Sequence, residues 1–199
     1  MKRTLTIIAL TALASACGGK SKPPAPAPVV EAPKPAPDPT PAPPPPPPPE
    51  PKVAKAELAP ASKSKVKGTI DFKEVEGGIE VIANIEGLKA GDHAYHVHEK
   101  GDCSAPDAAS AGGHFNPSSH KHGSPDSEEH HEGDFGNLTA GKDGKATKTF
   151  VMKGITLADG PNSIVGKGFI VHEKADDFKT QPTGNAGGRV ACGVITLVP

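Results

Sequence analysis

Proline divides this chain into two parts that must behave differently. Of its 24 prolines, 17 lie between Pro23 and Pro51, including the unbroken run from Pro43 to Pro49. Proline fixes the φ angle and has no amide hydrogen to donate, so this stretch favours an extended polyproline II conformation. The sequence therefore predicts a disordered or polyproline II tether over residues 18–51. Residues 52–199 remain for a folded domain, and they are numerous enough to enclose a core.

The first seventeen residues resemble a bacterial lipoprotein signal. Lys2 and Arg3 precede the apolar run from Leu5 to Leu13, which is too short to span a bilayer. Small residues then lead directly to Cys17, as in a lipobox, where cleavage exposes a cysteine that carries lipid. We expect residues 1–17 to be a signal peptide and Cys17 to be lipidated, which would anchor the protein to a membrane. An ordinary cleaved signal is the alternative.

The residues after Cys17 bear on localisation. Gly18 and Gly19 follow, with no aspartate beside the cysteine. By analogy with such lipoproteins, this predicts the outer membrane of a bacterial cell envelope. A fully extended tether of some 30 residues reaches roughly 90 Å, so we expect a periplasm-facing domain held clear of the membrane.

The charge and aromatic content exclude a nucleic-acid partner. The whole chain has a formal net charge of −1, so no basic excess is available to bind phosphates. Aromatic residues make up 4% of the chain and tryptophan is absent. A stacking platform for single-stranded nucleic acid is therefore also excluded.

Short alternating segments separated by turn residues predict an all-β domain. The expected strands cover residues 52–58, 66–72, 79–85, 94–98, 135–140, 146–151, 168–172 and 190–198. Several short strands of this kind argue for a sandwich or a barrel. Lys142-Asp143-Gly144 is typical of a hairpin turn. Two connections, residues 99–134 and 173–189, are long, and we expect them to carry function.

Nearly all of the nine histidines lie on or beside these two connections. His96 and His98 share one face of an expected strand, because side chains alternate along a strand. That pair alone is also compatible with a solvated polar face. The first long connection adds His114, His120, His122, His130, His131 and Asp134, and His172 ends the seventh expected strand. Imidazoles and a carboxylate gathered in this way predict a metal site.

Two cysteines occur in the domain region. An exported protein with two cysteines is expected to pair them, so Cys103 and Cys192 predict a disulfide. Two metal-binding thiols are the alternative.

Several motifs resemble those of copper/zinc superoxide dismutase. They are His96-Val97-His98-Glu99, Gly113-His114-Phe115-Asn116-Pro117, Lys121-His122-Gly123, Val171-His172-Glu173-Lys174-Ala175-Asp176-Asp177, Gly184-Asn185-Ala186-Gly187 and Arg189-Val190-Ala191-Cys192-Gly193. The resemblance covers essentially all of residues 52–199. It implies an eight-stranded Greek-key β-barrel, an immunoglobulin-like sandwich, with two long functional loops.

The resemblance also implies one copper ion and one zinc ion per subunit. The copper ligands would be His96, His98, His114 and His172, and the zinc ligands would be His114, His122, His131 and Asp134. His114 would bridge the metals and act in catalysis. Asp176 would link a copper histidine to a zinc histidine, and Cys103 and Cys192 would form the family disulfide. His93, His120 and His130 have no ligand role in this pattern and are expected to be surface or packing residues.

The implied activity is the conversion of superoxide to dioxygen and hydrogen peroxide by copper redox cycling, which would protect the cell envelope. Arg189 would attract the superoxide anion. A periplasmic copper and zinc buffer without turnover is the alternative. The resemblance also leaves a homodimer open.

Overall fold

The structure, a computed structural model, describes residue 25 and residues 50–199. Its eight strands are β1 (Val53–Pro60), β2 (Lys67–Val75), β3 (Gly78–Glu86), β4 (Gly91–His98), β5 (Asp134–Ala140), β6 (Ala146–Met152), β7 (Gly168–His172) and β8 (Arg189–Leu197). All eight expected strands are present, with ends that differ by at most three residues. A 3-10 turn at Ala109–Ala111 is the only helical element in residues 50–199. In this range, no helix is long and apolar enough to cross a membrane. The expected signal, Cys17 and nearly all of the tether lie outside the described residues.

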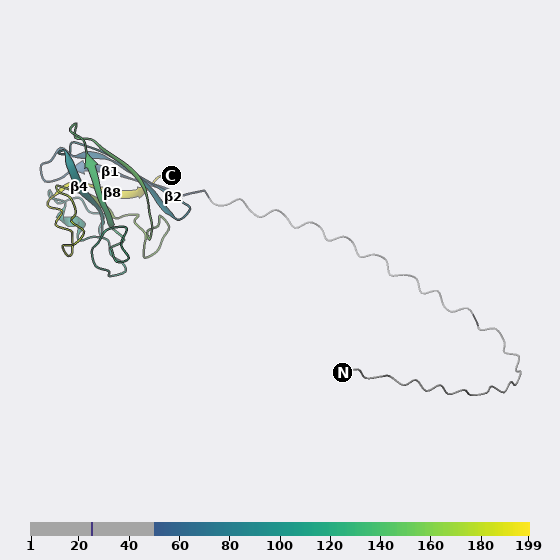
Figure 1. The fold of residues 1–199 in the computed structure, drawn as a ribbon. Helices are drawn as coiled ribbons and strands as arrows, with labels where there is room; N and C mark the ends of the chain where they lie inside the picture. The colour runs from purple at the N-terminus through teal and green to yellow at the C-terminus, as the bar shows by residue number, and fades with distance from the viewer. Residues whose placement is uncertain (1–24, 26–49) are drawn as a thin grey trace, which may run out of the picture. The chain divides into compact units, whose positions relative to one another are not determined.

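The strands form a nearly closed antiparallel barrel (Figure 1). Their order is β5-β4-β7-β8-β1-β2-β3-β6, and β5 and β6 at the two ends contact each other. Strands far apart in sequence are neighbours: β8 pairs with β1, and β4 pairs with β7. The predicted all-β Greek-key barrel is therefore confirmed.

The turn between β5 and β6 differs from the expected hairpin. The turn itself forms, because the amide of Gly141 donates to the carbonyl of Lys145 at 2.9 Å. The two strands are not ladder partners, however, since β5 pairs with β4 and β6 pairs with β3. Each of the two strands has a ladder partner along one edge only, so they stand at the two ends of the sheet order. The turn connects these two ends.

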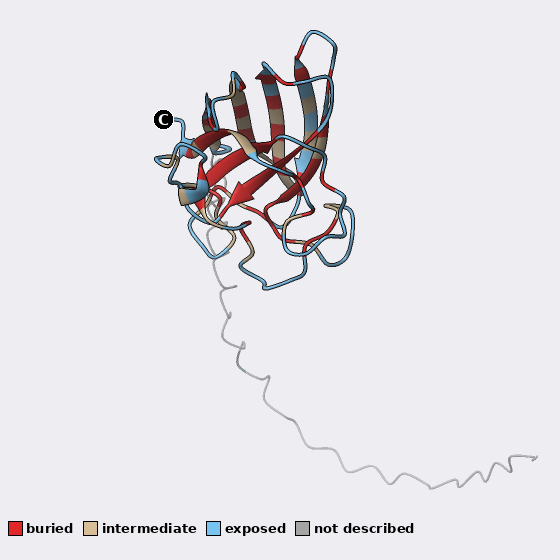
Figure 2. Cartoon of the chain, turned by 90° about the vertical axis from the view of Figure 1, so that its left-hand side faces the viewer, coloured by how far each residue is buried: buried red, intermediate tan, exposed pale blue. Residues whose placement is uncertain are grey.

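The side chains of β4 alternate between two faces, one toward the barrel core and one that carries metal-ligand candidates. Tyr95 and Val97 point into the core, where the Tyr95 ring lies 5.9 Å from Phe169 and 6.1 Å from Phe135, measured between centroids. His96 and His98 lie on the other face and are also buried. The strand is therefore covered on both sides. Figure 2 shows that exposed residues are concentrated on the connecting loops.

A disulfide ties the first long loop to the last strand. Cys103 and Cys192 are bonded, with their Cα atoms 5.8 Å apart. The predicted pairing is confirmed, and the alternative of two metal-binding thiols is wrong. A ring of this length stabilises the fold by roughly 4–5 kcal/mol in the chain-entropy account.

Candidate metal centre

Backbone hydrogen bonds hold the first long loop against β4. The amide of Phe115 donates to the carbonyl of Val97 at 2.8 Å, and the amide of Val97 donates to the carbonyl of Gly133 at 3.0 Å. Gly133 is required here because a Cβ atom at this position would lie 2.3 Å from the Val97 oxygen. These contacts bring His114 and Asp134, which are neighbours of the bonded residues, to the outer face of the strand.

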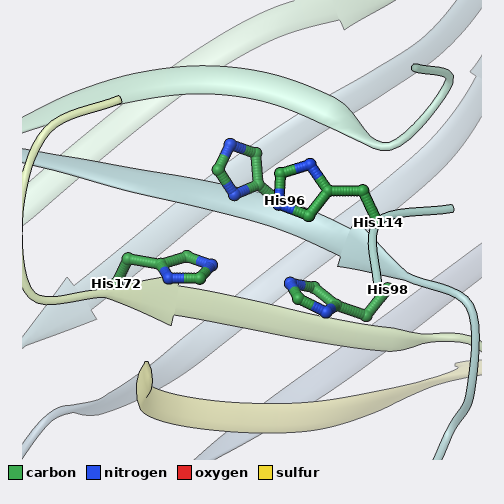
Figure 3. A group of neighbouring side chains, drawn as sticks. All are labelled: His96, His98, His114 and His172. Atoms are coloured by element: carbon green, nitrogen blue, oxygen red, sulfur yellow. The ribbon is translucent and has the colours of Figure 1, made fainter. Parts of the chain in front are cut away.

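Four histidines from three segments form the first donor group (Figure 3). His96 and His98 come from β4, His172 from the end of β7, and His114 from the loop. One nitrogen from each ring lies within 4.8 Å of the others, and all four residues are buried. The other nitrogens of His98 and His172 face the carbonyls of Gly112 and Gly187, at 2.9 and 3.4 Å. Those contacts fix how each ring is turned.

The inward nitrogens of this group fit a metal ion. Within residues 50–199, Nδ1 of His96 and Nε2 of His98, His114 and His172 are buried without a hydrogen-bond partner. Such orphaned polar atoms are costly, and a bound cation would satisfy all four together. Burial also lowers the pKa of His98 and His172, and it lowers the pKa of His114 to about 4. These three imidazoles are therefore neutral at pH 7, as metal binding requires.

The second donor group converges on one carboxylate oxygen. Oδ1 of Asp134 lies 2.8, 3.0 and 3.3 Å from Nδ1 of His114, His122 and His131, and Nδ1 of His114 and His131 are 3.5 Å apart. Tetrahedral zinc, with ligands about 2.0–2.1 Å away, separates its ligand atoms by roughly 3.3 Å. The donor set therefore has the composition and spacing of a closed zinc site.

The Asp134 carboxylate is fixed in its ionised form. Its Oδ2 accepts hydrogen bonds from the amides of His131 and Gly123, at 2.9 and 3.1 Å. Burial alone would raise the pKa of Asp134, but hydrogen bonds with the histidines hold that pKa far below its usual range. A buried anion is thus available at the centre of three imidazoles.

The ring of His114 belongs to both groups. Its Nε2 lies with the four-histidine group, and its Nδ1 is 2.8 Å from Oδ1 of Asp134. A single imidazole can therefore contact two ions at once. The structure places all seven predicted metal-ligand residues in these two adjoining groups.

A second bridge joins the groups from behind. Oδ2 of Asp176 accepts from Nε2 of His96 at 2.8 Å, and Oδ1 accepts from Nε2 of His122 at 2.9 Å. Burial would lower the pKa of His122, but hydrogen bonds to Asp134 and Asp176 raise it to about 9. Asn137 on β5 clamps the backbone of Asp176, accepting from its amide at 2.7 Å and donating to its carbonyl at 2.9 Å.

Close packing makes a glycine necessary at this bridge. Gly184 has a φ of 68°, and a Cβ atom there would lie 1.9 Å from Oδ1 of Asp176. Gln181, in the same loop, pairs with the backbone of His122, accepting at 2.9 Å and donating at 2.8 Å. Neither Asn137 nor Gln181 was predicted, because the sequence gives no local signal for partners 39 and 59 residues away.

Arg189 is held beside the four-histidine group by two loop carbonyls. Its Nη1 donates to Ala108 and its Nη2 to Gly112, each at 2.6 Å. The Gly112 oxygen is the one that also faces His98. Besides burial and the neighbouring imidazoles, the charge of Arg189 lowers the pKa of both His98 and His172. The residue is half-buried. Its two hydrogen bonds to the loop carbonyls hold the positive charge next to the four-histidine group.

The three remaining histidines lie outside both groups. His93 is buried, with Nδ1 2.9 Å from the carbonyl of His172 and Nε2 2.9 Å from that of Lys89. It is therefore a packing residue that contacts the backbone of a donor. His120 is exposed and His130 is partly exposed.

Comparison with known proteins agrees with this geometry. The sequence model of the family described as copper/zinc superoxide dismutase matches residues 66–195. The chain belongs to this family. The matched residues include every motif that carries the resemblance, from His96 on β4 to Gly193 on β8. Among solved structures, one described as the clock protein EA4 is 41% identical with a TM-score of 0.68, and the match covers 74% of this chain and 96% of that one.

Asp176→Asn should weaken zinc binding by about 10–100-fold, because loss of a hydrogen-bonded partner behind a metal ligand typically has this effect. The side-chain NH2 group of asparagine would replace one carboxylate oxygen. It would then point a donor at an imidazole N–H, which is also a donor, and that hydrogen bond would be lost. Competition with a chromophoric chelator measures the affinity. Asp177→Asn, the exposed neighbour, is the matched control and should bind zinc as the wild type does. Equal affinities in the two variants would contradict the role of Asp176.

Proposed function

We propose that this protein is a superoxide dismutase that converts superoxide to dioxygen and hydrogen peroxide. The observation that carries the proposal is the ring of His114, which has one nitrogen in each donor group. A storage site has no need of an imidazole shared between two ions. A one-electron reaction that also consumes protons can use a nitrogen that alternates between ligand and proton carrier.

The donor sets suit copper and zinc in different places. His96, His98, His114 and His172 would hold copper, because an all-nitrogen set suits a redox-active copper ion. His114, His122, His131 and Asp134 would hold zinc in a closed site, which is typical of structural zinc. When bound, copper would supply the one-electron oxidation of one superoxide and the one-electron reduction of the next.

The residues around the group supply binding and protons. Arg189 would attract and orient the anion, since its guanidinium is fixed next to the group by Ala108 and Gly112. His114 can hold a proton at Nε2 and donate it to the reduced oxygen. Two protons are consumed for each hydrogen peroxide formed, so solvent must supply the second. Asp134 and Asp176 keep the imidazoles oriented throughout.

Superoxide decay catalysed by the copper- and zinc-loaded protein tests this proposal. We expect fast, cyanide-sensitive decay in the wild type. His172→Ala should abolish that decay while zinc stays bound, because His172 belongs only to the four-histidine group. If the wild type holds both metals and does not accelerate decay, the copper and zinc buffer becomes the better explanation.

Arg189→Glu should slow turnover by about tenfold or more with unchanged metal content, since a local positive field raises the encounter rate with an anion. Lys142→Glu, in the exposed turn between β5 and β6, changes the net charge equally and is the matched control. Its decay rate should stay close to that of the wild type. Equal rates in the two variants would show that the anion is guided from elsewhere.

We also propose that the protein is a lipoprotein of the bacterial cell envelope, with Cys17 lipidated, residues 18–51 as a tether and the domain facing the periplasm. The small residues before Cys17 and the proline-rich stretch after it support this. Cys17→Ser should abolish incorporation of a labelled fatty acid in cells. Continued labelling of this variant would contradict the proposal.

A further inference from the structure

A hollow lies on the outer side of the first long loop, apart from both donor groups. Its volume is about 690 Å³, and the donors that line it include His120, His130 and Glu132. None of these three belongs to the two groups described above. His130 and Glu132 flank His131, whose side chain turns to Asp134. Two residues that line the hollow are therefore sequence neighbours of a donor of the buried centre.

Glu132 lines this hollow with one carboxylate oxygen that has no hydrogen-bond partner among residues 50–199. The residue is only 8% exposed. One of its carboxylate oxygens accepts a hydrogen bond from the hydroxyl of Ser118. Its Oε2 is buried, and no atom of residues 50–199 donates to it. A buried carboxylate oxygen without a donor is costly, and a bound cation would remove that cost.

The two histidines are held with one nitrogen free to act as a ligand. Asn116 fixes the backbone of His120, accepting from its amide at 3.0 Å and donating to its carbonyl at 2.9 Å. Nδ1 of His120 lies 3.3 Å from the carbonyl of His130, and Nδ1 of His130 lies 2.8 Å from that of Ser127. A carbonyl selects the tautomer with the proton on Nδ1, which leaves the lone pair on Nε2.

We propose that His120, His130 and Glu132 form a third metal site, for a borderline divalent ion such as Zn²⁺ or Cu²⁺. Two imidazoles and a carboxylate are ligands that these ions prefer, and a water molecule would complete the coordination. The three donor atoms do not all lie within 4.8 Å of one another, so the two rings must turn toward the carboxylate and exchange their carbonyl contacts for the ion. Binding is therefore weaker and more readily reversed than at the buried centre.

The other charged groups of the hollow leave the site accessible to a cation. Asp126 and Glu128 line it and add negative charge, and Lys153, which is exposed to solvent, lines it as well. Lys148 also lines it, but its ammonium donates to the carbonyl of Asn137 at 2.7 Å and lies over the rings of Tyr95 and Phe150. This lysine is thus engaged at the wall of the hollow.

Equilibrium dialysis with Zn²⁺ tests the site in the full-length protein, first loaded with one copper and one zinc per chain. We expect a third equivalent to bind. Two variants should each weaken binding of the third ion by at least about tenfold: the double variant His120→Gln/His130→Gln and the single variant Glu132→Gln. Loss of a residue that only hydrogen-bonds to a metal ligand typically lowers metal affinity by about 10–100-fold, and loss of a ligand itself should lower it at least as much. Glu129→Gln, an exposed change in the same loop that does not line the hollow, should retain it.

Absence of a third equivalent in the wild type would overturn the proposal, and so would its full retention by the double variant. The circular dichroism spectra of the loaded variants serve as a check on folding and should match that of the wild type. The proposal does not rest on dismutase activity. A protein without turnover would still bind the third ion.

Discussion

The arrangement of the centre depends on the buried ring of His114, which faces two sets of donors. One nitrogen adjoins the inward nitrogens of three other imidazoles, which lack hydrogen-bond partners within residues 50–199, and the other adjoins the ionised carboxylate of Asp134. Neither surrounding is stable for a bare imidazole in a dry interior, because lone pairs and negative charge are left without a compensating cation. Two bound ions would remove both costs, which explains why the protein can bury seven polar side chains beside its core.

Hydrogen bonds between distant segments fix the positions of the donor side chains. The first loop is held on β4 through Val97, Phe115 and Gly133. The second is held through Asp176, which contacts a histidine of each group and is clamped by Asn137. The disulfide joins the first loop to β8, the strand that begins with Arg189. One carbonyl, that of Gly112, then faces both His98 and Arg189, so the guanidinium and the donor group are positioned by the same backbone atom.

Much of this could be predicted from sequence. Short alternating segments and turn residues predicted all eight strands, although β4 and β7 are buried on both faces. Spacing within the family pattern selected His122 over His120 and His131 over His130. The partners of β5 and β6 could not be read from their turn, since the sheet order is set by pairing between distant strands. The roles of Asn137 and Gln181 were likewise missed, because each acts through backbone atoms of residues far away in sequence. The pairing of His120 with the carbonyl of His130 depends on how the loop folds back.

Electron paramagnetic resonance can show whether the imidazole of His114 would join two bound metal ions. Cu²⁺ would be placed in the four-histidine group and Co²⁺ in the group that contains Asp134. If His114 bridges the ions, their unpaired electrons are magnetically coupled, and the spectrum of isolated Cu²⁺ should disappear when Co²⁺ is added. An unchanged Cu²⁺ spectrum, with both metals confirmed in the protein, would show that His114 does not bridge the ions.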